Sequence, residues 1–147
     1  MITDLTEISR YLETKYPEEG CGLVFAEADG TFRVHPMANV YDRYHATDPL
    51  TYPRNNRTAY LFNPMEFQRL SEAADLRSAR LSCIFHSHCD VGAYFSAEDK
   101  AMAAPDGQPL FPDTAYLVVA VDRGQTTKAV LFRWSGVAFA EEPLPQK

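Results

Sequence analysis

A short apolar run, Leu81–Phe85, leads without a break into the polar sequence His86-Ser87-His88. The run has the length and composition of a buried β-strand. Side chains two positions apart in a strand point to the same face, so His86 and His88 are expected side by side where this strand ends. The chain must therefore fold around a sheet that holds two imidazoles at the end of one strand, where both can reach a single ion.

A third candidate ligand, Asp99, follows eleven residues after His88. The residues between them are enough to turn the chain and bring the start of a short helix back to the strand end. Two histidine nitrogens and one carboxylate oxygen, with water in the fourth position, are the ligands expected of a catalytic zinc ion. The sequence thus predicts a metal site made of His86, His88 and Asp99.

Each part of this pattern also has an explanation without a metal. A His-x-His pair is more often two ordinary histidines, and Ser96-Ala97-Glu98-Asp99 has the form of a helix capping box. The combination at this spacing, however, is expected by chance in roughly one chain in a few thousand. The two interpretations of Ser96 and Asp99 are also compatible, because a cap would hold Asp99 in the first helical turn, facing the strand end.

The rest of the chain alternates predicted helices and strands. Three helices are expected, over residues 3–15, about 64–77 and about 96–104. Their predicted caps are Thr3, Asn63 (followed by Pro64) and Ser96. The side chains expected to face the core are Leu5, Ile8, Tyr11 and Leu12 in the first helix, and Phe67, Leu70 and Ala74 in the second. Strands are expected over residues 21–26, 31–35, 58–62, 81–85, 116–121 and 128–134, with turns at Asp29-Gly30 and Asp122-Arg123-Gly124.

Two segments show no regular pattern. Asn39–Arg57 is polar, contains Pro49 and Pro53, and is predicted to be a long irregular loop of the kind that is often functional. Residues 141–147 form the end of the chain and are predicted to be frayed. These elements together predict one α/β (α+β) domain over residues 1–147, with a mixed, largely antiparallel sheet flanked by about three helices.

Composition narrows the class of protein further. The 147 residues are 46% hydrophobic, which suffices for one core. The net charge of −6 argues against a nucleic-acid partner, which would require clustered Lys and Arg. No apolar run is long enough to span a bilayer, and the N-terminus lacks the pattern of a secretory signal. Three cysteines do not suggest a disulfide framework, so we expect a soluble protein of a reducing compartment, the cytoplasm.

The motif His86-Ser87-His88, followed by Ser96-x-x-Asp99, resembles the metal motif of the JAMM (catalytic MPN-domain) metalloproteases. The short prokaryotic members of that family carry an upstream glutamate in a Pro-x-Glu-x-Cys-Gly context. Pro17-Glu18-Glu19-Gly20-Cys21-Gly22 matches this context and selects Glu19. The resemblance covers nearly the whole chain. It implies a JAMM/MPN-like (cytidine-deaminase-like) architecture with one zinc ion, Glu19 as the general base, and Ser96 as the hydrogen-bond donor to the oxyanion.

One departure from the family concerns the residues after the second histidine. Many relatives have proline there, whereas this chain has Cys89-Asp90. Either side chain is a potential ligand, since zinc readily binds cysteine sulfur. Simultaneous ligation by the adjacent residues His88 and Cys89 is geometrically awkward, and Asp90 is expected to cap the loop or face water. Ser87, between the histidines, is expected to point away from them and to have a structural role.

The resemblance also implies an activity. The family cleaves peptide or isopeptide bonds near the C-termini of ubiquitin-like proteins, and its small prokaryotic members are associated with sulfur-carrier proteins of ubiquitin fold. The expected partner is such a carrier, with its extended tail added as a strand beside the histidines. The alternative is a non-catalytic MPN-like zinc-binding module or scaffold. A zinc deaminase would need a Pro-Cys-x-x-Cys pattern that this chain lacks. The sequence gives no indication of the oligomeric state.

Overall fold

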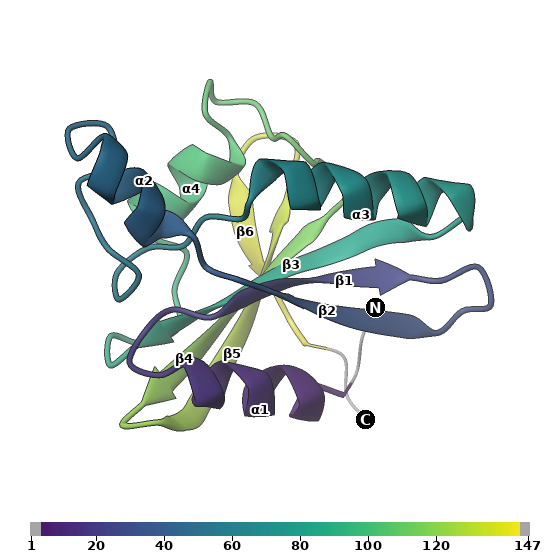
Figure 1. The fold of residues 1–147 in the computed structure, drawn as a ribbon. Helices are drawn as coiled ribbons and strands as arrows, with labels where there is room; N and C mark the ends of the chain where they lie inside the picture. Colours follow the sequence, from purple (N-terminus) through teal and green to yellow (C-terminus); the bar gives the residue numbers. More distant parts are fainter. Residues whose placement is uncertain (1–3, 145–147) are drawn as a thin grey trace.

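A six-stranded sheet forms the centre of the computed structural model, which describes residues 4–144 (Figure 1). Its strands are β1 (Cys21–Ala26), β2 (Phe32–Met37), β3 (Arg80–Cys89), β4 (Ala115–Asp122), β5 (Gln125–Trp134) and β6 (Phe139–Glu142). Their order across the sheet is β2-β1-β3-β4-β5-β6. Within residues 4–144, β3 and β4 are the only strands that pair in parallel, and the other neighbours are antiparallel. The predicted α/β (α+β) fold with a mixed, largely antiparallel sheet is therefore confirmed.

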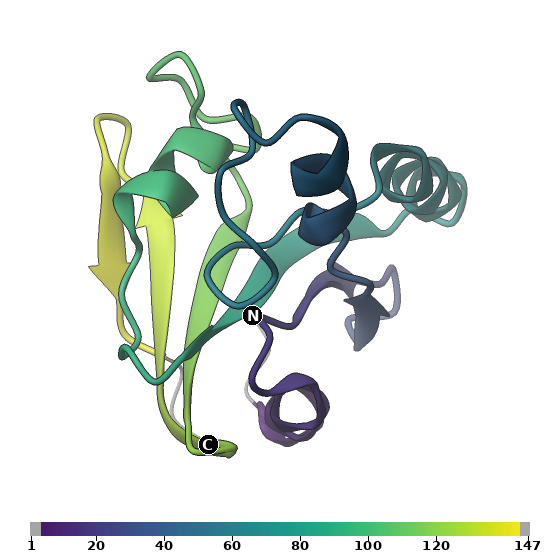
Figure 2. The ribbon, with the colours of Figure 1, turned by 60° about the vertical axis from the view of Figure 1, so that its left-hand side comes forward.

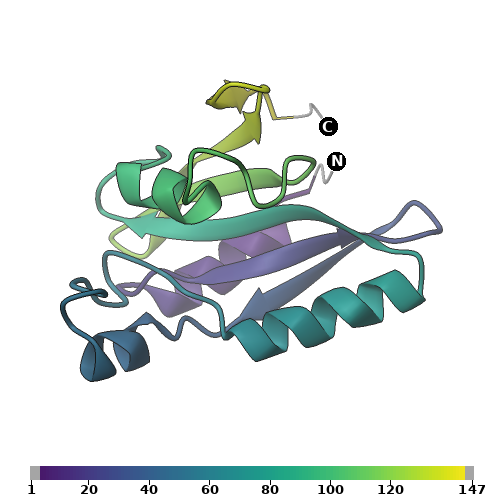
Figure 3. The ribbon, with the colours of Figure 1, turned by 90° about the horizontal axis from the view of Figure 1, so that it is seen from above.

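Helices cover both faces of this sheet. They are α1 (Thr6–Lys15), α2 (Tyr41–Thr47), α3 (Pro64–Leu76) and α4 (Ala97–Ala103). α1 lies on one face and α3 and α4 lie on the other (Figure 2). Seen from above, α3 and α4 are in front of the sheet and α1 is behind it (Figure 3). The side of β3 that carries its even-numbered residues thus faces α3 and α4.

The two faces bury separate apolar clusters. Against α1, Ile8 and Leu12 pack with Phe85 and other odd-numbered residues of β3 and β4. Against α3 and α4, Ile84 packs with aromatic and aliphatic side chains that include Phe67 and Leu70. Because β3 is buried on both faces from Ser82 to His88, it belongs at the centre of the sheet, between β1 and β4.

Local signals set several of the element boundaries. The Asn63 side chain accepts hydrogen bonds from the backbone N–H groups of Met65 and Glu66, so the predicted cap of α3 is confirmed. Arg123 and Gly124 form the two-residue turn between β4 and β5, and both have positive φ, as a type I′ hairpin requires. The predicted cap of α1, Thr3, lies outside the described residues. α1 begins at Thr6, whose N–H donates to Asp4 Oδ1.

Three predictions about secondary structure were wrong. Residues 58–62 do not form a strand, because the Asn39 side chain, and not a neighbouring strand, bonds the backbone of Ala59 and Leu61. α2 lies within the segment predicted to be an irregular loop, and makes a fourth helix among residues 4–144. β6 includes Glu141 and Glu142, which pair with β5 and are not frayed. Residues 145–147 of the predicted tail lie outside the described part of the chain.

Candidate metal centre

The two histidines lie at the end of β3, on the face that meets α4. His86 is fully buried and His88 is 4% exposed. Their Nε2 atoms point to the same oxygen: Asp99 Oδ2 is 3.2 Å from His86 Nε2 and 3.1 Å from His88 Nε2. The imidazoles thus converge on one point, which is the arrangement that two ligands of a shared ion require.

Asp99 reaches this point because of the way α4 begins. The Ser96 hydroxyl accepts a hydrogen bond from the Asp99 backbone N–H, and the Ser96 N–H donates to Asp99 Oδ2, each at 3.0 Å. The predicted capping box is confirmed. Burial alone would raise the pKa of Asp99, but the neighbouring imidazoles of His86 and His88 and the hydrogen bond from the Ser96 N–H hold that pKa well below its usual range. Asp99 is therefore a carboxylate at neutral pH.

Glu19 approaches the histidines from the segment between α1 and β1. One ligand atom from each of Glu19, His86 and His88 lies within 4.8 Å of the other two. Glu19 is only 5% exposed, and its Oε1 has no hydrogen-bond partner among the described residues. Burial, together with the charges of Asp99 and Glu98, raises the pKa of Glu19 to about 9, although Arg54 acts in the opposite direction. A carboxyl group in this position needs a positive charge nearby to ionise at neutral pH.

The state of the histidines also suits metal binding. His88 Nδ1 donates a hydrogen bond to the Gly92 carbonyl at 3.2 Å, because a carbonyl oxygen can only accept. Its Nε2 faces Asp99 Oδ2, and in the tautomer protonated at Nδ1 this atom carries the lone pair that would bind a metal, with the ring orientation fixed. His86 has two buried ring nitrogens that lack hydrogen-bond partners in residues 4–144, and burial lowers its pKa so that the ring stays neutral. The buried, unpartnered donors of this cluster fit a single divalent metal ion.

The side chains next to the histidines lie outside this cluster. Ser87 faces the opposite side of β3, where its hydroxyl accepts from the Gly20 N–H at 2.8 Å, which is a structural role. The Cys89 thiol donates to the Glu18 carbonyl, and burial raises its pKa to about 11, so it stays a neutral thiol. Asp90 accepts hydrogen bonds from the Tyr16 hydroxyl and the Arg123 N–H, and so it caps a loop.

A cavity of about 110 Å³ connects the cluster to solvent. Its lining residues are Glu19, Arg54, Arg57, Thr58, His88, Cys89, Val91, Tyr94 and Ser96. Two of the residues predicted to act in catalysis, Glu19 and Ser96, thus line one cavity together with His88. Glu98, in the first turn of α4, forms an ion pair with Arg54 at this site. A substrate that enters the cavity would meet these groups together.

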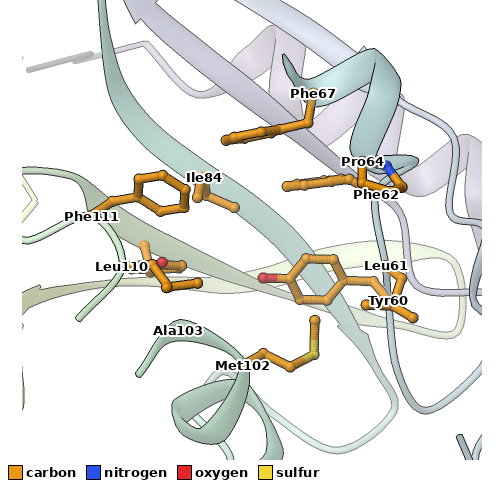
Figure 4. Close-up of a pocket in the computed structure, with 11 residues that line it drawn as sticks. Tyr60, Leu61, Phe62, Pro64, Phe67, Ile84, Met102, Ala103, Leu110 and Phe111 are labelled. Carbon is orange, nitrogen blue, oxygen red and sulfur yellow. The ribbon is translucent and has the colours of Figure 1, made fainter. Parts of the chain in front are cut away.

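A second cavity, of about 240 Å³, lies behind the site and is almost entirely apolar (Figure 4). Tyr60 forms the wall between this cavity and the metal cluster, since its ring stacks on His86 with 4.3 Å between ring centroids. In Figure 4 the Tyr60 hydroxyl points across the cavity toward Leu110, while Phe62 and Phe67 line the side nearer α3. Sequence reasoning missed Tyr60, because an aromatic residue after a polar loop gives no signal of what it stacks against.

The central strand ends in two converging histidines, and a helix-capped aspartate and a buried glutamate lie beside them. This arrangement is that of a JAB/MPN-class domain with a candidate metal site. The family model described as prokaryotic homologs of the JAB domain matches residues 3–135, and the chain belongs to this family. This match confirms the resemblance to the short prokaryotic JAMM type.

Solved structures agree with this fold. A solution structure of a protein from Desulfitobacterium hafniense has a TM-score of 0.68 and 21% sequence identity, and the match covers 97% of this chain and 88% of that one. A solution structure of a protein from Salinibacter ruber has a TM-score of 0.57 and 22% identity, covering 97% and 89% of the two chains. A search among curated proteins finds no significant match. No helix in residues 4–144 is long and apolar enough to cross a membrane.

Proposed function

We propose that this chain is a zinc-dependent peptidase that hydrolyses a peptide or isopeptide bond at the C-terminus of a ubiquitin-like protein of the sulfur-carrier type. One observation carries the proposal. The Nε2 atoms of His86 and His88 converge on Asp99 Oδ2, and the Glu19 carboxyl group lies in the same buried cluster, beside a cavity open to solvent. A binding module would not need a buried acid beside the metal ligands.

The proposed roles follow from the donor set. His86, His88 and Asp99 would hold the ion, and Glu19, the fourth member of the cluster, would act on the attacking water. Zinc bound there would supply a Lewis acid and lower the pKa of water to about 7. Glu19 then takes the proton of that water and delivers it to the leaving amine. The Ser96 hydroxyl, which accepts from the Asp99 N–H, keeps its own proton to donate to the carbonyl oxygen under attack.

The sheet restricts where the partner's tail could be added as a strand. At His86 both sides of β3 are paired, with Cys21 of β1 and with Val118 of β4, whereas at His88 only the β4 side is paired, with Ala120. The edges of the sheet are β2 and β6, far from the cluster in strand order. The tail would instead enter through the cavity lined by Glu19, His88 and Ser96.

The test combines metal analysis with mass spectrometry. The purified protein, loaded with zinc and then dialysed, should hold one zinc ion per chain. His86→Ala and Asp99→Ala should lose most of it, while His35→Ala, which removes a half-buried histidine on β2, should not. Incubation with a sulfur-carrier protein extended beyond its Gly-Gly end should release the extension, and Glu19→Gln should keep the zinc but stop the release. Zinc binding without hydrolysis of any extended carrier would favour the scaffold alternative.

A further inference from the structure

The apolar cavity behind the metal cluster has the lining of a ligand site. It lies between the segment that leads into α3, the end of α4 with the loop after it, and the strands β3 and β4 (Figure 4). None of the eleven described residues that line it is charged, and five of them are aromatic: Tyr60, Phe62, Phe67, Phe111 and Tyr116. The cavity shares no lining residue with the one that holds Glu19 and His88, so the two are separate sites.

The Tyr60 side chain places a polar group inside this apolar cavity. Tyr60 is 5% exposed, and its hydroxyl points across the cavity toward Leu110 (Figure 4). That hydroxyl forms no hydrogen bond with any other group of residues 4–144. A polar group that is buried without a partner costs free energy. A ligand that fills the cavity is therefore bound best when it brings a polar atom to the Tyr60 hydroxyl.

The lining selects an uncharged ligand with a flat ring. Phe62 and Phe67 have nearly parallel rings, with 6° between their planes and 6.0 Å between their centroids, and the ring of Phe111 lies 5.5 Å from that of Phe67. Aromatic side chains favour contact with another ring, either stacked with an offset or edge to face. A charged ligand would lose its hydration in the cavity and find no opposite charge among the lining residues.

The entrance of the cavity favours a free small molecule over a docked protein. Only Pro64 and Leu110 among the lining residues are exposed, and the others are buried or half-buried. A protein partner would need a wider exposed apolar surface around the cavity. A small molecule needs the buried lining alone. The volume of about 240 Å³ also exceeds the roughly 150 Å³ of an engineered cavity that binds benzene.

We propose that this cavity binds a small, uncharged aromatic molecule whose polar atom accepts a hydrogen bond from the Tyr60 hydroxyl. A tyrosine hydroxyl is protonated at neutral pH and can donate this bond. The Tyr60 ring also stacks on His86, with 4.3 Å between ring centroids. The bound molecule thus lies one ring away from the metal ligands. The site does not depend on hydrolysis, and it goes beyond the peptidase function proposed above.

The test is an NMR titration of the full chain with three probes of similar shape. Acetophenone has a carbonyl oxygen as acceptor, α-methylstyrene has a methylene group in place of that oxygen, and benzoate is an anion. Isotope-labelled methionine methyl groups report binding, because Met102 lines the cavity, whereas Met65 is 80% exposed and lies outside it. Acetophenone and α-methylstyrene should shift the Met102 signal saturably and leave the Met65 signal unchanged. Benzoate should give no saturable shift.

Substitutions separate the role of the hydroxyl from that of the cavity. Tyr60→Phe should weaken the binding of acetophenone about 2- to 12-fold, as expected for the loss of one neutral hydrogen bond. It should not weaken the binding of α-methylstyrene, which also shows that the cavity of this variant is intact. Leu110→Trp adds bulk at the exposed mouth and should abolish the binding of both probes. Leu50→Trp changes a residue that is 95% exposed and outside the cavity, and should keep it.

Three results would overturn the proposal. The first is a folded wild-type chain whose Met102 signal shows no saturable shift with acetophenone. The second is a Tyr60→Phe variant that binds acetophenone as tightly as the wild type, or that loses affinity for both probes equally. The third is a Met102 shift that only a protein of ubiquitin fold produces, which would assign the cavity to a partner's side chain. None of these results measures zinc binding or hydrolysis, so this proposal and the proposed function can fail separately.

Discussion

Replacing Glu19 by glutamine should stabilise the metal-free protein, with a gain that grows with pH. The buried carboxyl has its pKa raised from 4.5 to about 9, so between these values the folded chain keeps a proton that the unfolded chain releases. Folding stability then falls by about 1.4 kcal/mol for each pH unit in this window. At pH 7 the loss is about 3 kcal/mol, since 2.5 units separate pH 7 from 4.5. Glutamine has the same shape, stays uncharged in both states, and avoids this loss.

The measurement is urea unfolding of protein stripped of metal with a chelator, at several pH values from 5.5 to 8.5. The free energy of unfolding of Glu19→Gln should exceed that of wild type by about 1 kcal/mol at pH 5.5 and by about 3 kcal/mol at pH 7. The difference at pH 7 corresponds to a rise in Tm of roughly 6–12 °C for a chain of this size. Glu18→Gln removes the charge of the neighbouring, half-buried glutamate and serves as the matched control. A gain that is the same at every pH, or a loss at pH 7, would refute the argument that the carboxyl group is buried without a counter-charge.

Three other substitutions test the fold and the site. Gly22→Ala should destabilise the protein by about 3 kcal/mol in urea unfolding, because the added Cβ would lie 2.2 Å from the Phe85 ring. Gly30→Ala meets open space and should cost only the strain of an alanine at a φ of +88°, about 1–2 kcal/mol. Ser96→Ala should cost about 1 kcal/mol of stability, because the helix cap is lost. It should also lower the kcat of hydrolysis about 10²–10³-fold, and an unchanged kcat would show that Ser96 has no part in the mechanism. Asn56→Ala should cost about 2–3 kcal/mol and also lower kcat, since the Asn56 side chain bonds Asp42 and its carbonyl accepts from the Glu19 N–H; a change in stability alone would show that Glu19 keeps its place without it.

The sequence was sufficient for features that depend on local chemistry. The strand leading into His86 follows from a run of apolar residues, and the capping box that orients Asp99 follows from four consecutive residues. The Asn63 cap of α3 is of the same kind. These contacts form between residues close in the chain, so a single sequence contains the information that specifies them.

Long-range contacts could not be predicted in this way. Glu19 was selected only through the resemblance to a family, because nothing near it in the chain indicates that it is buried beside the histidines. Residues 58–62 have the composition of a strand but no neighbouring strand to pair with. The Asn39 side chain instead forms hydrogen bonds with the Ala59 carbonyl and the Leu61 N–H. The pairing of Asn56 with Asp42 depends on two polar residues of a segment that shows no periodicity.

The parallel pairing of β3 with β4 has a consequence for how the metal-binding cluster assembles during folding. β1 pairs with β2, and β4 with β5, through short turns, so each hairpin can form from local contacts. β3 has no such partner, because α3 lies between it and the first hairpin and α4 lies between it and the second. Two long loops must close when β3 joins the sheet. The chain loses the conformational entropy of these loops before the contacts of β3 are formed. His86 and His88 therefore meet Glu19 only when β3 has joined β1, and a nascent or partly folded chain has no complete metal-binding cluster.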